Sequence, residues 1–207
     1  MIVVETSRSG APILKVDGRA LASAVDPLRE AASWAKSVEA TLAPGTAAIV
    51  LGVGCGYHVA ALKVLCPRSQ VIAIESSAEV AAKALEFNPS LKPGDVIVEN
   101  DRMKLTEHAN VRDAIGGVFV PVTHGATAQI RPEWTSQMSA LLMARDKLSF
   151  LLQLRMRPDL FALLDPKKIE TLGSEPISIK TLQKLFNDTS ASSHERRLWR
   201  VLEELVL

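Results

Sequence analysis

Apolar runs and helical patterns alternate along the chain up to about residue 150. Four short runs rich in Val, Ile and Ala are typical of buried strands, and they lie at residues 47–51, 71–75, 96–99 and 116–121. Between them, apolar residues recur at helical spacing over residues 27–43, 57–65, 76–87 and 132–148. Strands that alternate with helices predict an α/β fold, with a doubly wound, mainly parallel sheet covered by helices on both faces.

The two ends of the chain carry different patterns. Two apolar stretches, 2–5 and 12–16, are separated by a turn at Ser7–Gly10 and followed by a turn at Asp17-Gly18, which predicts an N-terminal β-hairpin, a flap. After about Phe150 only helical patterns remain. We therefore expect a main domain at 1–150 and a small helical appendage at 151–207.

The last predicted helix of the appendage has an apolar face made of Leu198, Val201, Leu202 and Leu205. Such a face has to be buried against the rest of the domain or against a second copy, so a homodimer through this helix is one expected use. A helix-turn-helix could also be fitted to the appendage. Its basic and acidic residues nearly balance, however, which favours a solvated surface over a nucleic-acid contact.

The segment after the first predicted strand carries the strongest chemical pattern of the chain. It reads Gly52-Val53-Gly54-Cys55-Gly56 and leads directly into Tyr57-His58 and a helix. A strand that turns at once into a helix while holding a ligand against its backbone needs residues without Cβ. The next strand ends in Glu75, 75 − 56 = 19 residues beyond the last glycine. A carboxylate at that place is positioned to accept hydrogen bonds from ribose hydroxyls.

The spacing of the glycines narrows the class of nucleotide ligand. A dinucleotide turn has two residues between its second and third glycines, and a P-loop continues as Gly-Lys-Ser/Thr; this chain shows neither pattern. The tight Gly-x-Gly-x-Gly form, with an acid ending the second strand, resembles the S-adenosylmethionine-binding turn of class I methyltransferases, which have a Rossmann-like fold. One departure is that no acidic residue stands at Val50, Leu51 or Gly52, where that family usually has one.

This resemblance implies a set of residues that bind S-adenosylmethionine. The turn would cradle the methionine part of the cofactor, Glu75 would bind the ribose, and Asp101, at the end of the third strand, would lie beside the adenine. Asp101 is equally well explained as a solvated loop acid, and His58 as the start of a helix. The implied cofactor-binding set is Gly52, Gly54, Gly56, Tyr57, His58, Glu75, Ser76 and Asp101.

Catalytic residues are harder to find. Methyltransferases that act on nitrogen often carry Asn/Asp-Pro-Pro-Tyr/Phe after the fourth strand, and here the corresponding segment is Val120–Gly125. His124 is the candidate general base of this segment, since an imidazole with an ordinary pKa near 6.5 can deprotonate a hydroxyl. A simply exposed loop histidine is the alternative. Neither His58 nor His124 has the spacing of a triad or a metal site.

Composition and charge add few constraints. The net charge of +1 gives no reason to expect nucleic acid or an anionic membrane as a partner. No apolar run reaches the length of a membrane span and no signal peptide is recognisable, so we expect a cytoplasmic protein. The two cysteines, Cys55 and Cys66, indicate neither a disulfide framework nor a metal site, and Cys55 is best explained as a small residue filling a tight loop.

Several ordered motifs resemble a more specific family. They are Glu5–Gly18, Ser23–Ala31, Leu51–His58 and Ile74-Glu75, and together they look like the front part of motility accessory factor and 6-hydroxymethylpterin diphosphokinase-like proteins. The resemblance covers about residues 5–135. It implies a Rossmann-like domain associated with flagellin sugar transfer or pterin phosphorylation. Two functions therefore stay open: an S-adenosylmethionine-dependent methyl transfer to an unidentified acceptor, and a non-catalytic accessory domain that has lost or repurposed the pocket.

Overall fold

The computed structural model describes residues 1–157, and the chain forms two compact units, 1–143 and 144–207. The first unit contains the flap and the α/β sheet; the described part of the second, residues 144–157, contains the helix α8 (Lys147–Met156). The predicted appendage beyond residue 157, including the apolar face of Leu198 to Leu205 and the proposed dimer contact, lies outside the described residues. The expected domain boundary near residue 150 stays a prediction.

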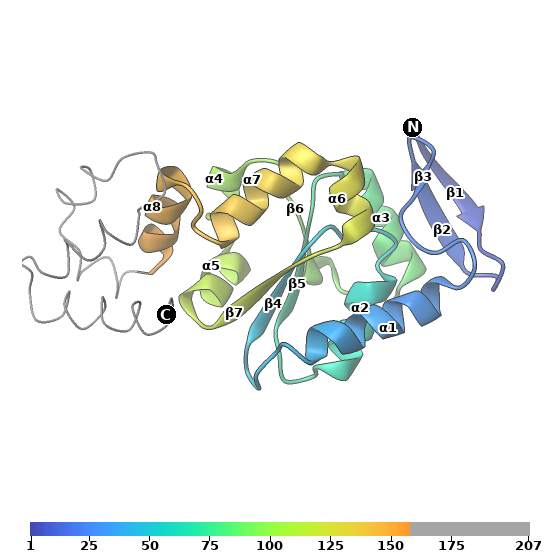
Figure 1. The fold of residues 1–207 in the computed structure, drawn as a ribbon, viewed down its shortest axis with the longest axis horizontal. Coiled ribbons are helices and arrows are strands. Elements are labelled where there is room, and N and C mark those ends of the chain that lie inside the picture. Colours follow the sequence, from blue (N-terminus) through green and yellow to red (C-terminus); the bar gives the residue numbers. More distant parts are fainter. Residues whose placement is uncertain (158–207) are drawn as a thin grey trace, which may run out of the picture. The chain divides into compact units, whose positions relative to one another are not determined.

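A four-stranded parallel sheet forms the centre of the first unit (Figure 1). Its strands are β4 (Ala47–Leu51), β5 (Val71–Glu75), β6 (Val96–Val98) and β7 (Phe119–Thr123), in the order β6-β5-β4-β7. Every residue of β4 and β5 is buried, as expected of strands covered on both faces. The predicted α/β, Rossmann-like fold class is confirmed.

The strand order creates a topological switch point. The chain moves outward from β4 to β5 and β6, and then returns to place β7 on the other side of β4. The connections that leave β4 and β7 therefore diverge, and the carboxyl ends of these two strands frame a crevice. In open α/β sheets such a crevice is the usual place for a ligand.

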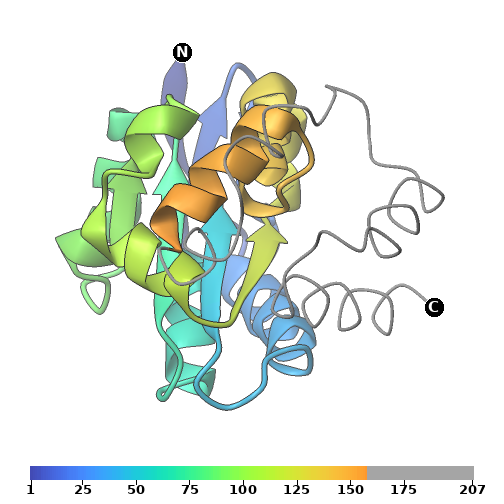
Figure 2. The ribbon, with the colours of Figure 1, turned by 90° about the vertical axis from the view of Figure 1, so that its left-hand side faces the viewer.

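Seven helices connect or follow the strands of the first unit. The helices are α1 (Pro27–Glu39), α2 (Tyr57–Leu65), α3 (Ala78–Phe87), α4 (Arg102–Leu105), α5 (Ala109–Gly116), α6 (Gly125–Ile130) and α7 (Pro132–Leu142), with a 3-10 turn η1 at Pro93–Asp95. Helix α1 packs along α2 (Figures 1 and 2). It begins where the sequence predicts, because the Asp26 side chain accepts a hydrogen bond from Arg29 N and Pro27 occupies the first turn.

The flap is a small antiparallel sheet, which confirms the predicted hairpin. Strand β1 (Ile2–Thr6) pairs with β2 (Pro12–Val16), and a short third strand, β3 (Arg19–Ala20), continues the sheet beyond the hairpin. The buried side chains of β2 and of Leu21 belong to the same apolar core as α1, α2 and the centre of β4. The flap is thus packed onto the α/β unit.

Three sequence predictions about elements need correction. The fourth strand is Phe119–Thr123 and not 116–121, because α5 ends only at Gly116. The long helix predicted at 132–148 ends at Leu142, and Ala144 has a positive φ of 49°, which a continuing helix cannot contain. The short helix α6 was not predicted at all, and it lies over the glycine turn.

Within residues 1–157 no helix combines the length and the hydropathy that a bilayer span requires. The same part of the chain contains no group of three or more His, Cys, Asp and Glu side chains arranged to hold a metal ion.

Candidate functional site

The glycine turn between β4 and α2 adopts the backbone conformation that its sequence predicts. Gly52 has a φ of 92° and Gly54 one of 49°, in the left-handed region that residues with a Cβ avoid. The space that a Cβ would fill is occupied by the protein itself. At Gly52 it would clash with the Thr127 side chain, and at Gly54 it would lie 2.7 Å from Cε1 of His124. The close approach of α6 thus explains these glycines without a ligand.

Glu75 is buried, and its carboxylate serves the chain's own backbone. Only 3% of the residue is exposed. One carboxylate oxygen accepts a hydrogen bond from Val53 N in the glycine turn at 3.0 Å, and the other accepts from Ser76 N at 2.8 Å and Ser77 N at 3.1 Å. The Ser76 hydroxyl donates to the same oxygen at 3.1 Å. Glu75 therefore fastens the end of β5 to the glycine turn.

We call this side of the turn, formed by Val53 and residues 75–77, the Glu75 edge. The hollow beside it measures about 20 Å³, which is roughly the space of one water molecule. It is lined by the flap residues Ile2 and Val16 and by α6 residues that include Thr127. The expected contacts of Glu75 and Ser76 with a ribose stay predictions, because this conformation leaves no room there for S-adenosylmethionine.

Asp101 lies at the carboxyl end of β6 and has a local structural role. Its side chain accepts a hydrogen bond from Met103 N at 2.7 Å and so caps α4. The neighbouring Asn100 side chain donates to Ser76 O at 2.8 Å. Asp101 lines neither the hollow at the Glu75 edge nor the larger cavity described next. The predicted contact with adenine stays a prediction.

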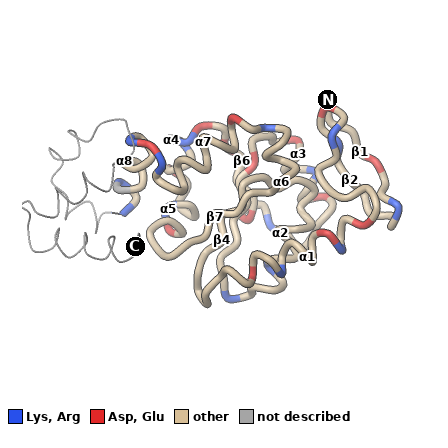
Figure 3. The backbone as a smooth tube through the Cα atoms, viewed as in Figure 1, with Lys and Arg blue, Asp and Glu red and all other residues tan. Residues whose placement is uncertain are grey.

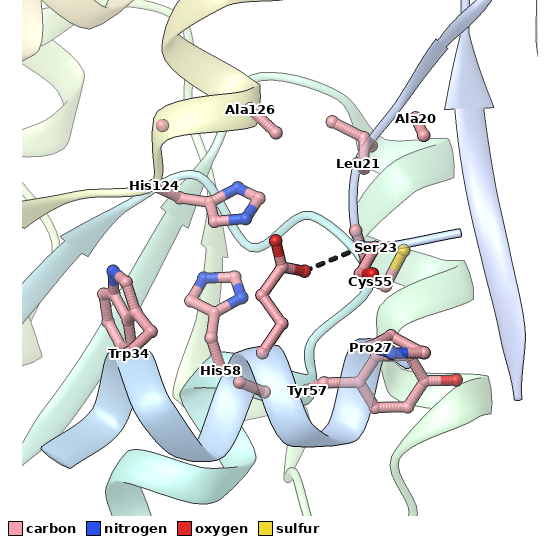
Figure 4. Close-up of a pocket in the computed structure, with 14 residues that line it drawn as sticks. Ala20, Leu21, Ser23, Pro27, Trp34, Cys55, Tyr57, His58, His124 and Ala126 are labelled. Carbon is pink, nitrogen blue, oxygen red and sulfur yellow. Dashed lines mark hydrogen bonds between the residues drawn. The ribbon is translucent and has the colours of Figure 1, made fainter. Parts of the chain in front are cut away.

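A larger cavity of about 270 Å³ lies on the other side of the glycine turn (Figure 4). It sits at the carboxyl ends of β4 and β7, which is the switch point of the sheet. The walls come from the chain after β3, from α1, from the glycine turn with the start of α2, and from the start of α6; the lining residues are Ala20, Leu21, Ala22, Ser23, Pro27, Glu30, Ala31, Trp34, Cys55, Tyr57, His58, His124, Gly125 and Ala126. We call it the histidine cavity.

Two histidines form one wall of this cavity. The rings of His58 and His124 stack in parallel, with centroids 4.1 Å apart and planes 7° apart, and the Trp34 ring meets His58 edge-on at 4.9 Å (Figure 4). His58 Nε2 is 3.1 Å from Gly52 O. Since a carbonyl oxygen only accepts, Nε2 carries the hydrogen and Nδ1 is left as an acceptor. His124 Nδ1 is 3.0 Å from the Thr127 hydroxyl.

Burial keeps both imidazoles uncharged at neutral pH. Desolvation lowers the pKa of His124 to about 4. For His58, desolvation and then the neighbouring His124 hold the pKa well below the usual 6.5. The ordinary pKa that the sequence led us to expect for His124 is therefore wrong. A base with so low a pKa is weak, which makes His124 a poor general base for a hydroxyl.

Three further side chains of the cavity have defined partners. Glu30 accepts a hydrogen bond from Ser23 N at 2.7 Å. The Tyr57 hydroxyl donates to Pro12 O at 2.7 Å and so joins α2 to the flap. Cys55 Sγ accepts from Leu14 N at 3.2 Å, and burial raises the pKa of its thiol to about 11. The thiol stays protonated at neutral pH, in agreement with its predicted role as a small filler.

The structure thus divides the predicted site residues between two places. Tyr57, His58 and His124 meet in the histidine cavity, whereas Glu75 and Ser76 lie at the separate Glu75 edge. Sequence reasoning missed Glu30 and Trp34. They are four residues apart on α1, next to the buried Ala31 and Ala35, and that spacing could have indicated two side chains at the rim of the helix's buried face.

Comparison with known proteins adds a likeness of fold only. No protein-family model matches the chain, and no curated protein matches it. Among solved structures, the crystal structure of MNMC2 from Aquifex aeolicus matches with 16% sequence identity and a TM-score of 0.33. The match covers 53% of this chain and 46% of that one, about half of each. At this level the likeness carries no argument about activity. Fold and site together define a Rossmann-like α/β domain with a cavity at its switch point.

Proposed function

We propose that this chain is a Rossmann-like small-molecule-binding domain whose ligand lies in the histidine cavity. The observation that carries the proposal is the place of the cavity, at the carboxyl ends of β4 and β7 where the strand order reverses. Its lining also has the usual character of a ligand site, since apolar side chains surround a few polar groups that converge on one space.

The flap supplies one wall of this site, and hydrogen bonds hold it to the rest of the unit; besides the Leu14 N–Cys55 Sγ contact, two further bonds do so. Arg19 Nη1 donates a hydrogen bond to Gln129 O on α6 at 3.0 Å, and the Tyr57 hydroxyl donates to Pro12 O. The chain after β3 then passes over the cavity, where Leu21 and Ser23 line it. A ligand there would be enclosed between the flap and the sheet edge, as in sites that bury most of a small ligand.

The chemistry of the lining supports binding more than catalysis. The two imidazoles are weak bases, and the one thiol of the cavity stays protonated at neutral pH. This agrees with the accessory function left open by the sequence, in which a Rossmann-like domain keeps its fold and repurposes the pocket. The suggested link to flagellin glycosylation or pterin phosphorylation rests on the sequence resemblance alone.

The proposal is tested by a cavity-filling variant and a set of matched small probes. We would titrate n-butylammonium, n-butanol and n-butyrate, up to tens of millimolar, into the labelled full chain, and follow the NMR resonances of the His58 and His124 imidazoles. At least one probe should shift both rings saturably, with millimolar affinity, as the small size of the probes allows. Ala126→Leu, which fills the cavity, should abolish that shift, and Ala78→Leu on the exposed start of α3 should not. If no probe shifts either ring, the proposal is wrong.

A second candidate function is S-adenosylmethionine-dependent methyl transfer. The observation that favours it is the Glu75 edge, where positive-φ glycines after β4 stand beside a carboxylate that ends β5. For this function α6 has to move away from the glycine turn, and Glu75 has to exchange its backbone partners for ribose hydroxyls. Calorimetric titration of S-adenosylhomocysteine decides between the two candidates. Micromolar binding that Glu75→Gln weakens about tenfold would favour the methyltransferase.

A further inference from the structure

The fixed charge of the histidine cavity has one sign. Glu30 contributes a carboxylate, and the part of the chain that the structure describes adds no Lys or Arg to the lining. His58, which is buried, and His124, which is half-buried, are uncharged at neutral pH because desolvation lowers the pKa of both imidazoles. A ligand that carries a phosphate or a carboxylate would therefore meet a negative charge with no basic side chain in the lining to offset it.

The cavity also offers hydrogen-bond acceptors that the chain does not use. One carboxylate oxygen of Glu30 accepts a hydrogen bond from Ser23 N, and among the described residues its other oxygen has no partner. His58 gives its Nε2 hydrogen to Gly52 O, and its Nδ1 lone pair has no partner within residues 1–157, although only 6% of the residue is exposed. Free acceptors on residues that line one cavity suit a ligand rich in N–H or O–H groups.

The aromatic side chains favour a positive charge over a neutral one. Trp34, His58 and His124, whose rings lie close together (Figure 4), line the same cavity as Glu30. A cation near an indole face is attracted by the ring quadrupole, and more strongly where water is partly excluded. One feature acts in the opposite direction, because the first turn of α2 also borders the cavity and a helix N-terminus attracts anions. Glu30, facing the same space, opposes that attraction.

We propose that the ligand of the histidine cavity is a small primary amine in its ammonium form. Its N–H groups are shared between the Glu30 carboxylate and His58 Nδ1, and its carbon skeleton lies against Trp34 and the small residues Ala31 and Ala126. This inference rests on the proposed function, since it names the ligand class of the same cavity. It assigns a binding role to Glu30 and Trp34, which the sequence did not single out.

The same three butyl probes test the charge preference, because they share a chain and differ in the head group. We expect n-butylammonium to bind at least ten times more tightly than n-butanol, and n-butyrate to shift neither imidazole. Tighter binding of butyrate, or equal binding of all three, would overturn the inference while leaving the cavity as a site. Binding of none is the separate failure of the proposed function.

Two charge-removing variants on helix α1 test whether the Glu30 carboxylate causes the preference for a cationic ligand. Glu30→Gln keeps an oxygen that can accept from Ser23 N but removes the charge, so butylammonium should bind about tenfold more weakly and butanol should be unaffected. Glu39→Gln, at the exposed end of the same helix, is the matched control and should change neither affinity. If Glu30→Gln leaves the binding of butylammonium unchanged, the carboxylate does not hold the cation and the inference is wrong.

Discussion

The two sides of the glycine turn differ in how their polar groups are satisfied. At the Glu75 edge the carboxylate already accepts hydrogen bonds from Val53, Ser76 and Ser77, and the hollow beside it measures about 20 Å³. In the histidine cavity, about 270 Å³ in volume, one carboxylate oxygen of Glu30 and Nδ1 of His58 accept no hydrogen bond from the described residues. A glycine turn that is typical of cofactor binding can therefore have the polar groups on one side satisfied by the protein itself. The hydrogen-bond acceptors that remain free for a ligand then lie on the other side.

The largest expected effect concerns the backbone that both sides share. Gly54→Val combines a positive φ with a Cβ 2.7 Å from the His124 ring and 3.2 Å from Leu21 O, so we expect a loss of about 3 kcal/mol or more in the free energy of unfolding. Urea denaturation measures this. Gly116→Ala, which has no positive φ and no atom within 4 Å of the new Cβ, is the control and should change stability by about 0.5 kcal/mol or less. A folded Gly54→Val protein of unchanged stability would mean that the turn is not packed as described.

The carboxylates of Glu75 and Glu30 should contribute very differently to the free energy of unfolding. Glu75→Gln removes a buried charge that accepts three backbone N–H groups, and we expect it to lower the free energy of unfolding by about 2–3 kcal/mol. Glu30→Gln should change it by roughly 0.5 kcal/mol or less, since Glu30 is exposed and glutamine still accepts from Ser23 N. If both substitutions lowered the free energy of unfolding equally in the same denaturation assay, the proposed difference between the Glu75 edge and the histidine cavity would be wrong.

The histidine cavity should make stability depend on pH. The pKa of His124 is about 4 in the folded chain and near 6.5 when unfolded, so between these values the unfolded chain binds more protons. Stability should therefore fall as the pH drops from about 6.5 toward 4, by up to about 1.4 kcal/mol per pH unit for each buried histidine. His124→Asn should flatten this slope in denaturation curves recorded across the range. An unchanged slope in the variant would contradict the lowered pKa of His124.

The smallest expected effect concerns Asp101, which lies away from the cavity. Asp101→Ala removes the cap of α4 and should cost about 1 kcal/mol or less of stability, because that helix is only four residues long. The affinity for n-butylammonium should stay the same in the NMR titration. Asp101→Asn, which can still cap, is the control for stability. A weaker affinity in Asp101→Ala would extend the site to the end of β6.

The α/β fold could be predicted because its strongest signals are local. The apolar runs of β4 and β5, the Asp26-Pro27 helix start and the glycines with positive φ each follow from a few neighbouring residues. Helix α6 escaped prediction because it is six residues long, has no side-chain cap and carries a weak apolar pattern. Its position over Gly52 and Gly54 nevertheless decides which side of the turn is open.

The candidate site was only partly predictable for a related reason. His58 and His124 could be singled out one by one, but their stacking depends on β4 and β7 being neighbours in the sheet. Glu75 was recognised from its place after β5, yet its backbone partners come from the exact path of the turn, which no spacing rule encodes. Glu30 and Trp34 reach the cavity only because α1 packs along α2.

The central claim is that a small ligand enters the histidine cavity and leaves the Glu75 edge unchanged. Backbone amide NMR shifts during titration with n-butylammonium and, separately, with S-adenosylhomocysteine test it most directly. We predict that butylammonium shifts the amides of Ser23, His58 and Gly125, which line the cavity, while those of Val53 and Ser77 stay in place. The opposite result, with the Val53 and Ser77 amides shifted by S-adenosylhomocysteine and no amide shifted by butylammonium, would contradict the claim.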